Sequence, residues 1–328
     1  MRPRLTPAVA DVRRAVRDSL AEVPEGSLIL AAVSGGPDSM ALAAGVAFEG
    51  PRLGYRIAAV IVDHQLQAGS AEVAAKTAEK LKGIGFTDTF VRQVVVRGTN
   101  ELAAREARYQ ALDALAEELD AAAVLLGHTL DDQAETVLLG LARGSGARSL
   151  SGMAPANGRY LRPLLGLGRE ITLAASEALE PWLDPHNSDP KYSRVRVRKN
   201  VLPVLEEELG PGIAESLART AEQLREDADY LDEVALAEYQ SMVKLGATSL
   251  TLPVAELQEL PRAIRFRVLK HAMEVVGSQP QRVHVLAVNE LIDDWHGQKE
   301  LAVPGVRVVR KSDQLELKTT KTLKPGAC

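Results

Sequence analysis

The first half of the sequence alternates short apolar segments with amphipathic ones, and this alternation limits the fold more than any other feature. The apolar segments cover residues 27–33, 56–62, 92–97 and 121–127, and helical patterns follow at 39–48, 70–85, 101–119 and 131–142. Strand-like runs that alternate with helices are typical of a parallel sheet covered on both faces. We therefore predict an α/β domain with a doubly wound parallel sheet over residues 1–210.

The second half has a different pattern. Residues 143–168 are rich in Gly, Pro and Arg and are expected to form loops near the functional site. A long helix is predicted from Pro211 to Lys244, further helices over 257–277 and 281–295, and a short hairpin that closes at Lys311 to Asp313. Residues 211–328 are thus expected to form a smaller α+β, mainly helical domain.

Composition excludes several classes of protein. The 328 residues are 46% hydrophobic and carry a net charge of −5, which argues against a surface that is basic throughout. The apolar runs are far shorter than the roughly 20 residues that cross a bilayer, and the basic first 20 residues resemble an amphipathic helix rather than a leader. We expect a cytoplasmic protein with no membrane partner. The single cysteine, Cys328, excludes an internal disulfide or a multi-cysteine metal site.

A glycine-containing loop lies between the first predicted strand and its helix. The sequence there is SGGPDS, formed by Ser34, Gly35, Gly36, Pro37, Asp38 and Ser39. Such a loop can present backbone N–H groups to phosphate at a helix start, although it matches neither a Walker A loop nor GxGxxG. Asp38 would suit a Mg²⁺ ion bound to a triphosphate. The alternative is a strand-to-helix turn with capping Ser and Asp side chains.

Polar side chains follow two other predicted strands. Asp63 and His64 end the second strand, and Gly127 and His128 end the fourth. In open parallel sheets, ligands bind at these carboxyl ends. Three carboxylates on the helix that follows the fourth strand could bind a cation, either an ammonium group or Mg²⁺; they belong to Asp131, Asp132 and Glu135. A strand cap and the favourable placement of acids at a helix start are the simpler explanations.

Two basic patterns complete the candidate site. Arg105 and Arg108 lie on one face of the helix predicted over 101–119, either as phosphate or substrate contacts or as parts of a surface ion-pair ladder. Arg194, Arg196 and Arg198 belong to the basic segment 191–199 of an otherwise acidic protein. Such a segment fits the phosphates of a nucleic acid, with one arginine available to a nucleotide, or it is a solvated face.

These motifs resemble those of a known family. SGGPDS resembles the SGGxDS loop of the PP-loop ATP pyrophosphatases, whose fold is Rossmann-like. The resemblance to one branch, the tRNA(Ile)-lysidine synthases, extends over most of the chain: VDHQL, ELAAREARYQAL, LLGHTLDDQAET, RGSGARSLSGM, RPLL and DPHNSDPKYSRVRVRKNVLPVLE. Several ordered motifs are stronger than a single one. Relatives often have a second histidine where this chain has Thr129, so no role is assigned at that position.

The resemblance implies a reaction and roles. ATP, with Mg²⁺ near Asp38, would adenylate C2–O of the wobble cytidine of isoleucine tRNA with anticodon CAU, and free L-lysine would then replace AMP. It implies catalytic roles for Asp38, Arg105, Asp132 and Glu135. ATP contacts are expected from residues 34–39, 63–64 and 127–128, and lysine or tRNA contacts from Arg108, Asp131, Asp132, Glu135, Arg194, Arg196 and Arg198. The C-terminal domain would bind tRNA, and acceptor-stem recognition would be reduced or different, because longer relatives carry a further domain.

Three other functions fit parts of the sequence. A tRNA thiolase would use the same loop and adenylate, but such enzymes generally need cysteines that Cys328 alone cannot supply. A small-molecule amidotransferase-type ligase would leave the basic segment unexplained. A non-catalytic ATP-binding or tRNA-binding module would bind ATP without releasing pyrophosphate. The sequence does not set the oligomeric state, so a homodimer is left open.

Overall fold

The computed structural model describes residues 5–65, 69–96, 101–144, 146–184 and 189–319, with the side chain of Glu101 left out. Leu66 of VDHQL, residues 185–188 of the DPHNSDP motif and Cys328 lie outside the described residues. The chain divides into two compact units, Met1–Arg225 and Glu226–Cys328. Each unit has its own hydrophobic core and is described by itself.

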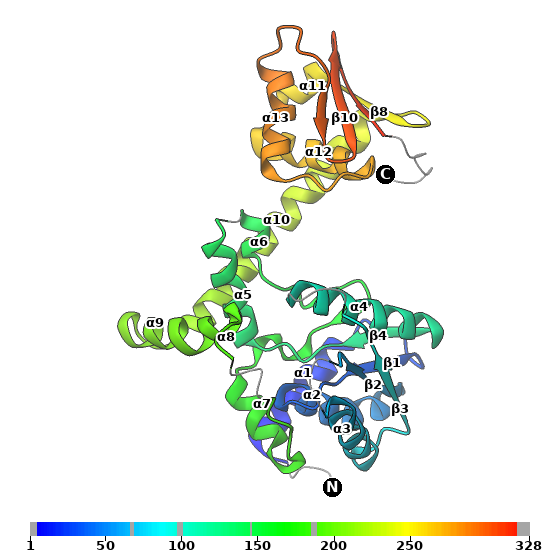
Figure 1. Ribbon diagram of the computed structural model, residues 1–328, viewed down its shortest axis with the longest axis vertical. Helices are drawn as coiled ribbons and strands as arrows, with labels where there is room; N and C mark the ends of the chain where they lie inside the picture. Colours follow the sequence, from blue (N-terminus) through cyan, green and yellow to red (C-terminus); the bar gives the residue numbers. More distant parts are fainter. Residues whose placement is uncertain (1–4, 66–68, 97–100, 145, 185–188, 320–328) are drawn as a thin grey trace. The chain divides into compact units, whose positions relative to one another are not determined.

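The first unit contains a six-stranded sheet in the order β3-β2-β1-β4-β6-β5 (Figure 1). Its strands are β1 (Leu28–Ala32), β2 (Arg56–Asp63), β3 (Asp88–Gln93), β4 (Ala121–Leu125), β5 (Ala156–Asn157) and β6 (Tyr160–Leu161). All neighbouring pairs are parallel except β5 and β6. The predicted doubly wound sheet is confirmed. The third strand begins four residues earlier than predicted, and β6 extends the sheet from a segment expected to be loop.

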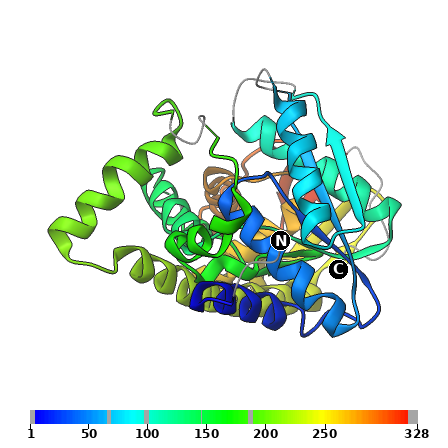
Figure 2. The same ribbon diagram turned by 90° about the horizontal axis from the view of Figure 1, so that it is seen from below.

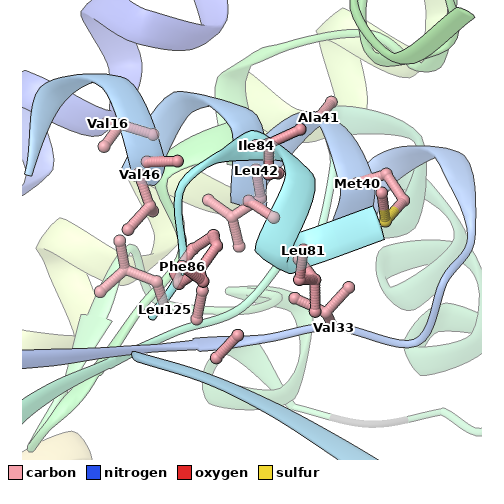
Figure 3. Packing of buried hydrophobic residues seen from close by; sticks show 14 of the residues in the cluster. Val16, Val33, Met40, Ala41, Leu42, Val46, Leu81, Ile84, Phe86 and Leu125 are labelled. Carbon is pink, nitrogen blue, oxygen red and sulfur yellow. The ribbon is translucent and has the colours of Figure 1, made fainter. Parts of the chain in front are cut away.

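Both faces of this sheet are buried. Ile29 and Ala31 of β1 pack in a core with α1 (Pro7–Ser19), α2 (Pro37–Glu49) and α3 (Ser70–Ile84). Figure 3 shows this packing at Val16 of α1, Leu42 of α2 and Leu81 of α3. Leu28 and Leu30 alternate to the other face, where they pack with α4 (Glu101–Glu118). Alternate residues of a strand point to opposite faces, so continuous apolar runs indicate helices on both sides.

The sheet is followed by a helical part of the first unit. Its elements are α5 (Leu130–Ala142), α6 (Ala147–Leu150), η2 (Pro163–Gly166), α7 (Arg169–Ser176), η3 (Glu177–Leu179), α8 (Ser193–Arg196), the π-turn η5 (Val197–Val201), α9 (Leu202–Leu209) and the start of α10 (Ile213–Met242). Ala134 of α5 packs on Val197, Leu202 and Leu217. Helix α9 projects away from the strands in both views (Figures 1 and 2).

The two units divide within helix α10, at Arg225 and Glu226, rather than at residues 210 and 211 as expected. The beginning of α10 packs with the first unit, because Ile213, Ala214 and Leu217 join the cluster around α5. Arg225 also donates hydrogen bonds to the carbonyl oxygens of Ser151 and Met153. The helix pattern that begins near Pro211 therefore marks the start of α10. The boundary between the units lies further along this helix, because the first part of α10 packs with the first unit.

The second unit combines helices with a larger sheet than predicted. Its elements after α10 are β7 (Lys244–Leu245), β8 (Ser249–Pro253), α11 (Val254–Glu259), α12 (Arg262–Val275), α13 (Arg282–Asp293), β9 (Leu301–Val303), β10 (Val306–Lys311) and β11 (Gln314–Lys318). The hairpin is confirmed, since Lys311 pairs with Gln314. It is part of an antiparallel sheet in the order β7-β8-β11-β10-β9. Within the described part of the chain, every helix is too short or too polar to span a bilayer.

Candidate active site

The SGGPDS loop forms a tight turn from β1 into α2. The Ser34 N–H donates to Ser39 Oγ at 3.1 Å, and the Ser39 hydroxyl donates to the Gly36 carbonyl oxygen at 2.9 Å. Gly36 is the N-cap of α2, and Pro37 occupies its first turn. The first N–H groups of a helix have no partner within the helix, so this end can hold an anion. The predicted phosphate loop therefore has suitable geometry.

Two glycines let backbone segments approach the loop closely. Gly35 has φ +87°, and a Cβ there would lie 2.6 Å from Thr77 Oγ1 of α3. At the end of β4, a Cβ on Gly127 would lie 3.2 Å from the Asp38 carbonyl oxygen. Glycine avoids both contacts because it has no Cβ. Gly127 thus brings the end of β4 against the start of α2.

A cavity of about 530 Å³ opens at the carboxyl ends of β1, β2 and β4. Its lining residues are Ala32, Val33, Ser34, Gly36, Pro37, Asp38, Ser39, Val60, Val62, His64, Arg108, Leu112, Leu126, Gly127, His128, Asp132, Arg169, Leu173, Trp182, Leu183, Asp184 and Arg198. The volume lies in the usual range for a small-molecule site. The cavity thus brings together residues from all the strand ends that the sequence singled out.

The three carboxylates of α5 have different surroundings. Thr129 caps this helix, with its N–H donating to Asp132 Oδ2 at 2.9 Å. Asp132 lines the cavity. Asp131 accepts a hydrogen bond from the backbone N–H of Arg169 at 2.7 Å and so fixes the start of α7. Glu135 is fully buried behind the cavity wall.

Two arginines neutralise this cluster. Arg198 Nε and Nη2 donate to the two oxygens of Glu135 at 2.7 and 3.2 Å. Arg169 Nη2 donates to Asp132 Oδ1 at 3.0 Å, and Arg198 Nη2 lies 3.6 Å from the same oxygen. Burial raises the pKa of Glu135, and the hydrogen bond from Arg198 opposes that shift. The cluster thus already holds two cations.

Asp38 lies between the loop and this cluster. Its carboxylate accepts a hydrogen bond from the Thr172 hydroxyl, and its Oδ2 is 3.7 Å from Arg169 Nε. Burial raises the pKa of Asp38, while Thr172 and Arg169 oppose the shift. Of the described residues, no group of three or more His, Cys, Asp or Glu side chains is arranged to hold a metal. Mg²⁺ often binds through one carboxylate plus substrate phosphates, and Asp38 beside the loop fits that arrangement.

The three arginines of the basic segment do not act together. Arg194 and Arg198 are four residues apart on one helical face, and Arg194 Nη2 lies 3.5 Å from Thr136 Oγ1 of α5. Arg196 points elsewhere and donates to the carbonyl oxygens of Pro190 and Lys191. Among them, Arg198 lines the cavity.

The cavity lining also includes two histidines, His64 and His128. Burial lowers the pKa of His128 to about 3, and Arg108, Arg162 and Arg105 add to this shift while Asp132 opposes it. Burial also lowers the pKa of His64, with a contribution from Arg108. Both rings are therefore neutral near pH 7.

Two further candidates, Asp63 and Arg105, are not among the residues that line the cavity. Asp63 is buried at the end of β2, and its Oδ1 accepts a hydrogen bond from the Gln65 N–H at 2.9 Å. Arg105 Nη2 lies 3.3 Å from the Tyr109 hydroxyl, so its side chain lies along α4 rather than at the cavity surface.

Comparison with known proteins identifies the family. Residues 9–205 match a PP-loop domain, and residues 252–316 match a TilS substrate binding domain. A tRNA(Ile)-lysidine synthase of Leifsonia xyli is 55% identical over 88% of this chain and 89% of its own. That of Thermobifida fusca is 52% identical over 94% and 96%. This chain belongs to the tRNA(Ile)-lysidine synthase family.

The fold of this family member extends to a more distant protein. The U34-tRNA thiolase NcsA from Methanococcus maripaludis, solved with its [4Fe-4S] cluster, aligns with a TM-score of 0.55 and 18% identity over 67% of this chain and 80% of that one. At this identity the likeness concerns the fold alone. It agrees with the PP-loop architecture of the lysidine synthase family.

Three residues of this family member's site were not singled out from the sequence. Arg169 directly follows the segment 143–168 that was expected to form loops near the site, but no role was predicted for it. Thr172 and Trp182 carried no signal of their own, although Thr172 donates to Asp38 and the Trp182 N–H donates to the Gly35 carbonyl oxygen at 2.8 Å. All three lie at least 130 residues after the end of the loop. The RPLL motif at residues 162–165, shortly before α7, and the DPHNSDP motif, shortly after Trp182, were the signals near this region.

Proposed function

We propose that this protein ligates lysine to C2 of the wobble cytidine in isoleucine tRNA with anticodon CAU, using ATP. The product, lysidine, changes the codon read and the amino acid carried from methionine to isoleucine. The observation that carries this proposal is that the phosphate loop and Asp132 line one cavity, in a chain that is 55% identical to a tRNA(Ile)-lysidine synthase.

ATP would occupy this cavity in a defined direction. The triphosphate would lie on the backbone of residues 34–39, at the N-terminus of α2. The adenine would lie among apolar side chains at the ends of the sheet strands, where Val60, Leu112 and Leu126 line the cavity. His64, Gly127 and His128 border the same space, with Asp63 buried beneath it. Asp38 would hold Mg²⁺, which supplies charge neutralisation of the phosphates.

The reaction would proceed in two steps. First, O2 of the cytidine attacks the α-phosphorus of ATP and the bond to pyrophosphate breaks, which leaves an adenylated cytidine. Next, the ε-amine of lysine attacks C2, the C2–O bond breaks and AMP leaves. The cytidine must first leave its stack to enter the site. The cavity's main task is to position the reactants and neutralise their charge.

Of the three α5 carboxylates, Asp132 is best placed to accept the proton of the attacking amine, because it is the one that lines the cavity. Glu135 and Asp131 would act on lysine through the two arginines that they hold. Arg108, which also lines the cavity, would contact ATP or the tRNA, and Arg105 would support it from α4. Arg194 and Arg196 would meet tRNA phosphates outside the cavity.

The second unit would bind the tRNA, as the match of residues 252–316 to a substrate binding domain suggests. We place the enzyme in the cytoplasm, where its tRNA substrate is made. A homodimer remains a proposal that sedimentation of the purified protein would test. The thiolase alternative is less favoured because the chain has one cysteine, which cannot provide the thiolates of a cluster.

The test is direct transfer of lysine. Purified protein would be incubated with ATP, Mg²⁺, radiolabelled lysine and an unmodified CAU isoleucine tRNA transcript, with a methionine tRNA transcript as control. We expect label in the isoleucine transcript only. ATP cleavage to AMP without label would mean that another nucleophile replaces lysine, and ATP binding without pyrophosphate release would favour the non-catalytic module.

The role of Asp132 has its own test. Asp132→Asn should lower the rate at subsaturating lysine by about 10²–10⁴-fold, the usual contribution of a general base. The matched control is Asp88→Asn at the exposed amino end of β3. An unchanged rate in the Asp132 variant would rule out the assignment.

A further inference from the structure

The phosphate loop of this protein lacks its own cation. Walker A loops contain a lysine that reaches the β- and γ-phosphates, whereas SGGPDS contains none and carries Asp38 instead. A carboxylate next to a triphosphate adds repulsion, which a positive side chain from another segment would reduce together with the Mg²⁺ held at Asp38. The cavity lining contains three arginines that could do so, namely Arg108, Arg169 and Arg198.

Arg169 forms an ion pair with Asp38 of the loop. It is the first residue of α7, after the N-cap Gly168, and its side chain is 19% exposed. Its Nε lies 3.7 Å from Asp38 Oδ2, and Asp38 is the loop residue in the first turn of α2. The guanidinium therefore lies at the same helix start that would bind the phosphates.

Arg198 is held much more firmly. It donates two hydrogen bonds to the fully buried Glu135, at 2.7 and 3.2 Å. Breaking this pair would leave the Glu135 charge buried without compensation, which is strongly unfavourable. Arg198 is thus fixed in the wall of the cavity.

Two of the three guanidinium nitrogens of Arg169 lie outside hydrogen-bond distance of the carboxylates that they face. Its Nη2 bonds to Asp132 at 3.0 Å, but Nε and Nη1 approach Asp38 and Glu135 at 3.7 and 3.6 Å, beyond hydrogen-bond distance. A guanidinium has five N–H donors in a planar fork that matches phosphate oxygens. Its backbone is anchored separately by Asp131, so the side chain can shift while α7 stays in place.

We propose that Arg169 is the phosphate-neutralising side chain of the ATP site, in place of the lysine of other phosphate loops. This inference rests on the proposed function, in which the loop binds ATP. Arg169 keeps its hydrogen bond to Asp132 and directs its remaining donors to the β- and γ-phosphate oxygens. The same side chain thus links the nucleotide site to the carboxylate that receives the lysine.

The test compares a ligand without phosphate groups with one that carries a triphosphate. Binding of adenosine and of a non-hydrolysable ATP analogue, with Mg²⁺, is measured by calorimetry for the wild type, Arg169→Gln and Arg169→Lys. We expect the glutamine variant to lose at least tenfold in affinity for the analogue and less than twofold for adenosine. The lysine variant, which keeps the charge but not the fork, should lose less.

Arg56→Gln is the matched control, because Arg56 is exposed at the amino end of β2, opposite the site. An unchanged analogue affinity in Arg169→Gln, with a raised KM for lysine, would overturn the inference and leave Arg169 as a positioning residue for Asp132. An equal loss for both ligands would overturn it too. If the glutamine variant does not fold, the same ratio is taken from the lysine variant. A wild type that binds the analogue but transfers no lysine would contradict the proposed function alone.

Discussion

The two units bury charge in different ways. In the first unit, Glu135 is fully buried and its charge is met by Arg198 next to a cavity. In the second unit, Arg265 is buried and donates to Asp293 at 3.0 Å, but Asp293 is 48% exposed. Arg265 also reaches the Leu257 carbonyl oxygen, so it connects α11, α12 and α13.

This difference separates two uses of a buried charge. A buried ion pair is weak support for stability, because desolvation of both charges offsets their attraction. The first unit retains several such charges where they line or support a cavity, which we attribute to function. The second unit places one charge near its surface, where it joins helices. Substitution of a buried charge should therefore affect activity mainly in the first unit and stability mainly in the second.

The largest effect is expected for Glu135→Ala. It removes the buried carboxylate that holds the partly exposed Arg198 guanidinium, which should lower the free energy of unfolding by up to about 3 kcal/mol. Lysine transfer should also fall below detection. Denaturant unfolding and the lysine assay measure the two effects. A folded Glu135→Gln variant separates them, and full activity in that variant would contradict the proposed use of this charge.

Acid should weaken the first unit through His128. Its pKa is about 3 in the folded protein and about 6.5 when unfolded, so the unfolded state binds more protons between these values. Stability from this group is complete above about pH 6.5 and is lost as the pH falls toward 3, by up to about 1.4 kcal/mol per unit. Unfolding titrations of wild type and His128→Gln should differ in slope there. Parallel curves would show that burial of this ring does not drive the loss.

A glycine in each unit gives a smaller, matched comparison. Gly35→Ala meets both a positive φ and a 2.6 Å contact with Thr77 Oγ1, so we expect a loss of about 2 kcal/mol and weaker ATP binding. Gly305→Ala, with φ +74° and its nearest neighbour at 3.7 Å, should lose only about 1 kcal/mol. Thermal unfolding measures both. Equal losses would mean that the contact with α3 relaxes freely.

The smallest effect is expected for Arg265→Met in the second unit. Methionine fills similar volume, and Asp293 stays half-exposed, so the free energy of unfolding should change by less than about 1.5 kcal/mol. Adenylation and lysine transfer should match the wild type. A large loss of transfer without a loss of stability would show that the second unit also uses its buried charge for function.

The sequence predicts those parts of the site that are formed by residues close to one another in the chain. Residues 34–39 form one contiguous loop, and the strand ends are marked by the residues that directly follow apolar runs. By contrast, the ion pair of Arg198 and Glu135 joins residues that are 63 positions apart in the sequence. Arg169 and Asp38, which also form an ion pair, are even farther apart in the sequence. No periodicity encodes such contacts, so the α5 carboxylates looked like an open cation site.

The same limit applies to the fold. The parallel sheet follows from long apolar runs, whereas β8 is five residues long and pairs with β11, more than 60 residues later in the chain. Its short, half-buried pattern gave no signal, so the second unit was expected to be mainly helical. Strand pairing over such distances depends on tertiary contacts rather than local propensity.

The π-turn at Val197–Val201 determines how a change in chain length would move the residues of the site. Arg198 lies inside it, and Leu202 follows it and packs on α5. A π-turn holds one residue more than an α-helical turn, so deletion of one residue here can give a regular α-helical turn and keep Leu202 on α5. Insertion of a residue would instead rotate everything after it by about 100° and move Leu202 off α5. This segment should therefore tolerate a deletion better than an insertion between residues 197 and 202.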